Sequence, residues 1–170
     1  AYLKLKPLYS NIKLIFAPHE IDLPNIERLK KQLQTKQISC DLFTEQKVPF
    51  QSSVLILDTM GMLSSIYQYG NVAFIGGGFN NGIHNLLEPS VFGLPVLFGP
   101  NHQKFNEANE LINLKAGFEI ANDDDFVKFL TRFLTNEDYL KATSTISRNY
   151  VVSKSGGTAK IIEGLNPYFN

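Results

Sequence analysis

The sequence has one cysteine, no excess of charge of either sign and no long apolar run, and each scarcity excludes a class of protein. Cys40 alone cannot form an internal disulfide, which fits a reducing compartment. Lys plus Arg equals Asp plus Glu at 16 each, so no basic field attracts a nucleic-acid backbone, and we predict no nucleic-acid partner. No segment approaches the roughly 20 apolar residues that span a bilayer, and no charged-then-apolar leader opens the chain, which is expected to be soluble as given.

Several motifs of nucleotide and hydrolase chemistry are also missing. The first strand-to-helix turn, residues 17–20 (APHE), lacks the glycines of a dinucleotide fingerprint, and no Gly-Lys-Ser/Thr phosphate loop is present. There is no His-Glu-x-x-His metal motif and no Gly-x-Ser-x-Gly elbow. The three acids at residues 123–125 are explained by helix capping and the helix dipole. We therefore expect no cofactor and no metal ion.

What the sequence does contain is an alternation of strand and helix patterns. At 170 residues with 44% hydrophobic content, the chain can bury one core and form one domain. Runs that predict strands occupy residues 12–17, 40–44, 53–57, 72–75, 95–98 and 116–120. Helices are predicted from residue 22, near 60, from 84 or 85, and at 106–114, 123–134, 137–150 and 154–166. This order predicts a doubly wound α/β domain of about six parallel strands, preceded by a linker-like segment at residues 1–11.

The carboxyl ends of parallel strands meet at one edge of a sheet, and ligands bind there. The loops expected at that edge are residues 18–20, 58–62, 76–84 and 99–105. They contain all three histidines of the chain, His19, His84 and His102. This placement predicts that the loops form the ligand-binding edge.

The most unusual stretch is VAFIGGGFNNGIHNLLEPSVFGLPVLFG, residues 72–99. A strand that ends in glycines and gives way to a helix presents backbone N–H groups and the positive end of a helix dipole, which suits an anion. Glu88 follows His84 and Asn85 by about one helical turn, and its carboxylate can accept two hydrogen bonds from a ribose diol. The pattern indicates a nucleotide-sugar half-site, although the residues alone leave open that Glu88 only caps a helix.

Two segments resemble a known family. The run GGGFNNGIHNLLEPSVFGLPVLFGPNHQKF (residues 76–105), with LDTMGMLSSIY (57–67) ahead of it, resembles the C-terminal half of the 3-deoxy-D-manno-octulosonic acid (Kdo) transferases. The Glu-Pro-x-x-x-Gly-x-Pro-Val element is shared by many glycosyltransferases of the GT-B fold. Joined to the preceding His-Asn, the following Gly-Pro…Phe and the upstream Asp-Thr-Met-Gly, it becomes specific to Kdo transferases.

The resemblance implies the Rossmann-like C-terminal half of a GT-B glycosyltransferase. Residues 12–170 would form a CMP-Kdo binding domain with C-terminal helices, and residues 1–11 a linker from a missing N-terminal domain. Such enzymes transfer Kdo, with inversion, from CMP-Kdo to a lipid A precursor during lipopolysaccharide biosynthesis. They work at the cytoplasmic face of the inner membrane of Gram-negative bacteria.

The family's general base is a glutamate of the N-terminal domain. The resemblance therefore implies that this chain holds no catalytic residue and transfers nothing alone, and that the acceptor and the membrane surface are met through the missing half. The alternative is a GT-B module with UDP-sugar specificity or without catalysis.

The resemblance also implies roles for individual residues. Gly61, Met62 and Leu63 would offer a helix N-terminus to the CMP phosphate, and Pro18 and His19 would flank the cytosine or the phosphate. The remaining implied donor contacts are Gly77, Gly78, His84, Asn85 and Glu88, with Asn85 and Glu88 at the ribose and residues 76–78 leaving room for the donor. Many family members have arginine at the position of His19 and glutamate at that of Met62. A histidine binds phosphate more weakly than a guanidinium fork, so the phosphate contact is expected to differ here.

Overall fold

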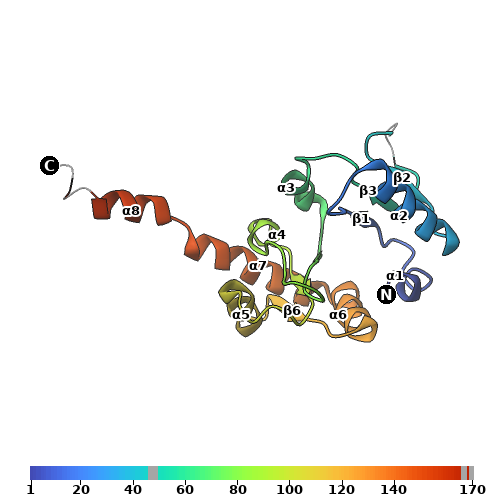
Figure 1. Ribbon diagram of the computed structural model, residues 1–170. Helices are drawn as coiled ribbons and strands as arrows, with labels where there is room; N and C mark the ends of the chain where they lie inside the picture. The colour runs from blue at the N-terminus through green and yellow to red at the C-terminus, as the bar shows by residue number, and fades with distance from the viewer. Residues whose placement is uncertain (46–49, 166–167, 169–170) are drawn as a thin grey trace. The chain divides into compact units, whose positions relative to one another are not determined.

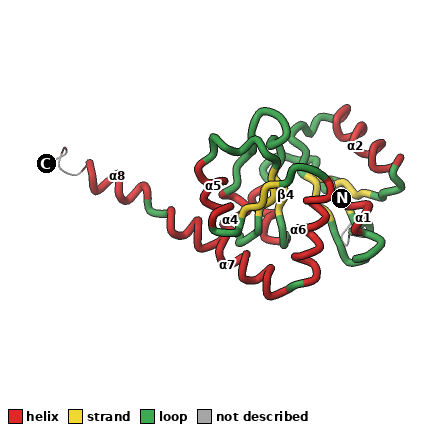
Figure 2. Tube along the Cα trace, turned by 90° about the horizontal axis from the view of Figure 1, so that it is seen from below, coloured by secondary structure: helices red, strands yellow, loops and turns green. Residues whose placement is uncertain are grey.

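The computed structural model describes residues 1–45, 50–165 and 168, without the side chains of 158–160. The chain divides into two compact units, Ala1–Ile66 (unit 1) and Tyr67–Asn170 (unit 2). Strands alternate with helices along the chain, and each unit contains one three-stranded parallel sheet (Figures 1 and 2). The six parallel strands predicted from the sequence are confirmed, as is the α/β class.

Unit 1 is built on a parallel sheet of order β1-β3-β2. Its elements are α1 (Tyr2–Leu5), β1 (Leu14–Phe16), α2 (Leu23–Thr35), β2 (Cys40–Leu42), β3 (Val54–Ile56) and α3 (Leu63–Ile66). Helix α2 begins where the sequence predicted, because the carboxylate of Asp22 accepts a hydrogen bond from the Asn25 backbone at 3.0 Å. Its apolar face packs on the sheet, with Ile26, Leu42 and Ile56 at the centre of the core.

Two segments of unit 1 add detail to the sequence analysis. Residues 2–5 form a helical turn whose Leu5 is buried, and the Tyr2 hydroxyl lies 2.6 Å from that of Ser53. The linker role of residues 1–11 stays a prediction. The helix that the sequence predicts near residue 60 starts later, and Asp58 does not cap it. Helix α3 begins at Leu63, and the Asp58 carboxylate instead accepts hydrogen bonds from the backbone and hydroxyl of Thr44.

Unit 2 contains a parallel sheet of order β4-β5-β6. Its elements are the 3₁₀ turn η1 (Tyr67–Tyr69), β4 (Ala73–Ile75), α4 (Leu87–Val91), β5 (Val96–Phe98), α5 (Asn106–Asn113), β6 (Gly117–Glu119), α6 (Asp123–Thr135), α7 (Glu137–Lys154) and α8 (Gly157–Leu165). All three residues of β5, the central strand, are fully buried. This explains why its sequence is a continuous apolar run.

Both faces of β5 carry a core. Val96 and Phe98 face a cluster that includes Leu111 of α5 and Tyr150 of α7, whereas Leu97 faces a cluster with Phe133 of α6. Helices therefore cover both faces of this sheet, as in a doubly wound fold. In the part of the chain that the structure describes, no helix is long and apolar enough to cross a membrane.

Candidate functional site

The candidate residues of unit 1 lie at one edge of its sheet. Strands β1 and β3 are adjacent and parallel, so the loop with Pro18 and His19 and the loop with Gly61 and Met62 leave the sheet on the same side. Gly61 has a φ of +80°, and no atom of the described residues lies within 4 Å of the position a Cβ would take. Glycine is needed there for the backbone conformation rather than for space. Leu63 starts α3, a helix of one turn.

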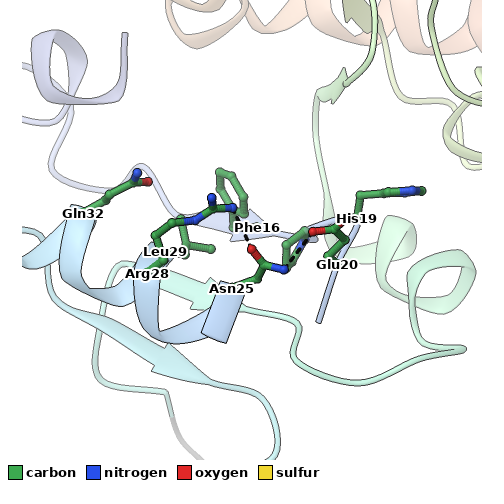
Figure 3. Close-up of a pocket in the computed structure, with 8 residues that line it drawn as sticks. Phe16, His19, Glu20, Asn25, Arg28, Leu29 and Gln32 are labelled. Atoms are coloured by element: carbon green, nitrogen blue, oxygen red, sulfur yellow. Dashed lines mark hydrogen bonds between the residues drawn. The ribbon is translucent and has the colours of Figure 1, made fainter. Parts of the chain in front are cut away.

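An open hollow of about 390 Å³ adjoins Pro18 and His19 (Figure 3). Arg28 of α2 lines it, and its guanidinium donates to the Asn25 amide oxygen at 2.7 Å. The Asn25 amide in turn donates to Glu20 at 2.8 Å, so both signs of charge border the hollow. The sequence analysis missed Arg28. Its position on α2, which directly follows the loop of residues 17–22, was the available signal.

In unit 2 the glycines after β4 are packed against the chain itself. Gly77 has a φ of +86°, and a Cβ there would lie 2.1 Å from the Gly82 carbonyl oxygen. A Cβ on Gly78 would lie 2.6 Å from the backbone nitrogen of Gly99. The space beside these two glycines, expected to be left for a donor, is therefore filled by backbone. Any ligand contact at Gly77 or Gly78 has to come from their main-chain atoms.

The loop after β5 (residues 99–105) is hydrogen-bonded to the loop after β4 (residues 76–84), which we call the glycine loop. The Asn101 backbone donates to the Gly78 carbonyl at 2.8 Å, and its side-chain amide donates to the Asn80 carbonyl at 2.8 Å. The ring of Phe105 lies 3.1 Å from the position a Cβ on Gly82 would take. The two loops at this edge thus form one interlocked structure.

His102 does not belong to the ligand-facing surface. It is only 5% exposed, its Nε2 lies 2.6 Å from a carboxylate oxygen of Glu119, and its ring meets Phe98 edge-on. Among the described residues its Nδ1 has no hydrogen-bond partner. The sequence analysis correctly placed His102 in a loop after a strand, but that loop turns the imidazole into the protein. The three histidines therefore do not share one role.

The Glu-Pro-x-x-x-Gly-x-Pro-Val element is largely explained by packing. Pro89 and Ser90 are buried in α4, and Gly93 ends that helix with a φ of +78°. The Leu94 N–H bonds to the Pro89 carbonyl and the Gly93 N–H to that of Ser90, a helix end that requires the left-handed conformation. Packing does not explain Glu88, whose side chain is only half-buried.

Glu88 is held by its neighbour Asn85. The Asn85 amide nitrogen donates to Glu88 Oε1 at 2.9 Å, and its Oδ1 accepts from the Leu87 backbone at 2.8 Å. Asn85 thus accepts from a backbone N–H of the first turn of α4, from one position before the N-cap residue Leu86, whose side chain makes no capping hydrogen bond. His84 lies on the glycine loop, its Nε2 3.4 Å from the position a Cβ on Gly77 would take. The structure therefore brings His84 together with the glycine loop, and Asn85 together with Glu88.

The charge of Glu88 acts on Tyr67, a residue that the sequence analysis did not associate with it. Burial, and after it the charge of the Glu88 carboxylate, raises the pKa of Tyr67 above its ordinary value. Tyr67 packs against the core, whereas Tyr69 is 71% exposed. No local sequence pattern links residue 67 to residue 88.

Structural comparison defines the class of the fold, which is that of the C-terminal domain of a GT-B glycosyltransferase. The crystal structure of the C-terminal CMP-Kdo binding domain of WaaA from Acinetobacter baumannii matches 89% of this chain and 80% of its own, with a TM-score of 0.76 and 23% identity. The spinosyn forosaminyltransferase SpnP matches 93% of this chain and 44% of its own, with a TM-score of 0.53 and 18% identity.

Sequence comparison finds Kdo transferases among the proteins similar to this chain. The Kdo transferase of Aquifex aeolicus is 34% identical over 143 residues, covering 83% of this chain and 39% of that protein. That of Chlamydophila psittaci is 31% identical over 137 residues, covering 79% and 31%. A bifunctional glycosyltransferase/methyltransferase of Fusobacterium nucleatum is 34% identical over 69% of the chain. No protein-family model matches the chain.

The chain is thus homologous to Kdo transferases over most of its length, which confirms the resemblance stated from its motifs. It spans less than half the length of these relatives.

Proposed function

We propose that this chain is the donor-binding part of an inverting Kdo transferase and that it binds CMP-Kdo. The observation that carries the proposal is the Glu88 carboxylate. It is only half-buried although Pro89 and Ser90, which follow it, are buried, and one of its oxygens is already held by Asn85. An ionised carboxylate only accepts hydrogen bonds, so its second oxygen suits a ribose hydroxyl.

The other proposed donor contacts follow from the homology and keep the roles given above. In unit 1 they are Pro18, His19, Gly61, Met62 and Leu63, and in unit 2 Gly77, Gly78 and His84. Main-chain atoms provide the contacts at Gly61, Gly77 and Gly78, because glycine has nothing else to offer. At Met62 the backbone contact is kept despite the change of side chain from the glutamate of many relatives.

The acceptor is proposed to be a lipid A precursor, met by an N-terminal domain that residues 1–11 connect to this one. That domain would carry the general base and the membrane-facing surface, at the cytoplasmic face of the inner membrane. The 170-residue chain is then expected to bind donor without transferring Kdo. Incubation with CMP-Kdo and a lipid A precursor should give no glycosylated product by mass spectrometry, and product formed by this chain alone would contradict the assignment of the base.

Glu88→Gln tests the ribose contact. The amide keeps the shape of the side chain but removes a charge-assisted acceptor, which is worth about 1.5–3 kcal/mol. The Kd for CMP, measured by calorimetry, should therefore rise about ten- to hundredfold. Glu107→Gln is the matched control, because Glu107 occupies the first turn of α5 as Glu88 does that of α4. An unchanged Kd in Glu88→Gln would remove Glu88 from the ribose site.

A further inference from the structure

We infer that Asn85 is a positioning residue that aims the Glu88 carboxylate at the ribose, rather than a residue that itself binds the donor. The inference rests on the proposed function and refines it. Both residues of the pair had been assigned to the ribose from the resemblance, and the geometry gives them different tasks. Glu88 offers an acceptor to the ligand, and Asn85 holds that acceptor in place.

The orientation of the Asn85 amide is fixed by the backbone. A main-chain N–H can only donate, so the atom 2.8 Å from the Leu87 nitrogen has to be the amide oxygen. The amide nitrogen then faces Glu88 Oε1 at 2.9 Å, where it meets an acceptor. Both the oxygen and the nitrogen of the Asn85 amide are thus hydrogen-bonded within the protein. Their partners, Leu87 and Glu88, lie in the first turn of α4.

The backbone beneath Glu88 is held by packing and hydrogen bonds. Leu86, Pro89 and Ser90 are buried, and the Ser90 hydroxyl donates to the Leu86 carbonyl at 2.8 Å. Behind them Gly93 closes the helix, and the Ser147 hydroxyl of α7 donates to the Leu94 carbonyl at 2.8 Å. The freedom left to Glu88 is in its side chain, and the Asn85 amide restricts it there. A ligand then binds a carboxylate that is already oriented, so less binding free energy is spent on ordering the Glu88 side chain.

This division of tasks makes a distinctive prediction about ribose recognition. If Asn85 acts through Glu88, its removal has to weaken the contact with the ribose diol more than contacts elsewhere on the nucleotide. Comparison of CMP with 2′-deoxy-CMP isolates that contact, since the two ligands differ by one hydroxyl. A general loss of structure would weaken both ligands equally.

The experiment measures Kd for CMP and 2′-deoxy-CMP by calorimetry on the 170-residue chain and four variants. These are Asn85→Ala, Asn85→Ser, Glu88→Gln and the double variant Asn85→Ala/Glu88→Gln. Asn85→Ala should weaken CMP at least fivefold and lower the preference for CMP over its deoxy form. In the Glu88→Gln background, the same substitution should change the Kd for CMP less than twofold.

Asn85→Ser separates positioning from helix capping. Serine keeps an oxygen that accepts from the Leu87 N–H but has no amide nitrogen for Glu88. It should recover melting temperature lost in Asn85→Ala while binding CMP as weakly as that variant. Recovery of CMP affinity together with stability would show that Asn85 acts only through its hydrogen bond with the Leu87 N–H, and would overturn the inference.

Two further outcomes would overturn it. Equal weakening of CMP and 2′-deoxy-CMP by Asn85→Ala, or the same loss with and without the Glu88 carboxylate, would give Asn85 a direct or purely structural role. In either case the proposed function survives if the unaltered chain binds CMP and prefers it to the deoxy form. A chain that binds no CMP refutes the proposed function, and the inference falls with it.

Discussion

At the scale of single residues, glycines with the same backbone conformation are required for different physical reasons. Gly61 and Gly77 have φ values of +80° and +86°. Gly61 faces open space, whereas Gly77 faces the Gly82 carbonyl at a distance no Cβ could tolerate. The sequence showed that both positions are unusual, but only the folded contacts show which glycine permits a loop to close on itself.

The two glycines form a matched pair for mutation. Gly61→Ala should destabilise the chain by about 1–2 kcal/mol, since a left-handed backbone is unfavourable for alanine. Gly77→Ala should cost about 1–3 kcal/mol more, because the added carbon also collides with backbone. Urea unfolding monitored by circular dichroism measures both. Equal losses would show that the contact between residues 77 and 82 is not as close as the structure has it.

His102 shows a limit of sequence analysis at this scale. Its position in a loop after a strand predicted a place near the ligand edge, and strand order does put the loop there. The direction of the side chain depends on Phe98 and Glu119, which the local sequence does not place beside it. Asn85 and Glu88 were easier to associate, because their separation of three residues already puts them on one side of a helical turn.

At the scale of elements, local signals predicted the strands and longer helices and failed at the short ones. Asp22, Asn122 and Asn136 cap α2, α6 and α7 with their side chains. The helix expected from residue 84 or 85 begins only at Leu87, because Asn85 holds the first turn from outside it. Helix α3 likewise begins later than residue 60, and the Asp58 carboxylate before it is bound by Thr44 of another segment.

The contact between α5 and α7 predicts a dependence of stability on alkaline pH. Tyr150 of α7 donates to the Glu110 carboxylate of α5 at 2.8 Å. Burial, followed by this hydrogen bond, raises the pKa of Tyr150 above its ordinary value near 10. The folded chain therefore holds this proton more tightly than the unfolded chain does. The resulting stability is fully present below about pH 10 and is lost as the pH rises through the folded pKa.

Tyr150→Phe removes that contribution. Urea unfolding at pH 8 and above pH 10 should show a smaller alkaline loss in this variant than in the unaltered chain. Tyr69→Phe serves as the control, because Tyr69 is 71% exposed. An alkaline loss that is the same with and without the Tyr150 hydroxyl would contradict this account of the α5–α7 contact.

At the scale of the whole chain, alternation of strand and helix patterns was enough to predict an α/β fold with six parallel strands. It did not predict the division into two units, each with its own sheet and core. That division depends on contacts between segments far apart in the sequence. The candidate site was predictable as a set of loops, whereas the packing of Gly77 and Gly78 against backbone and the electrostatic effect of Glu88 on Tyr67 required the fold.

Nucleotide choice tests the central claim most directly. The 170-residue chain is titrated by calorimetry with CMP, UMP, UDP and ADP under identical conditions. The proposed function predicts the lowest Kd for CMP, because CMP is the nucleotide of the proposed donor, CMP-Kdo. A preference for UDP over CMP would contradict the claim and favour a GT-B module that serves another sugar nucleotide.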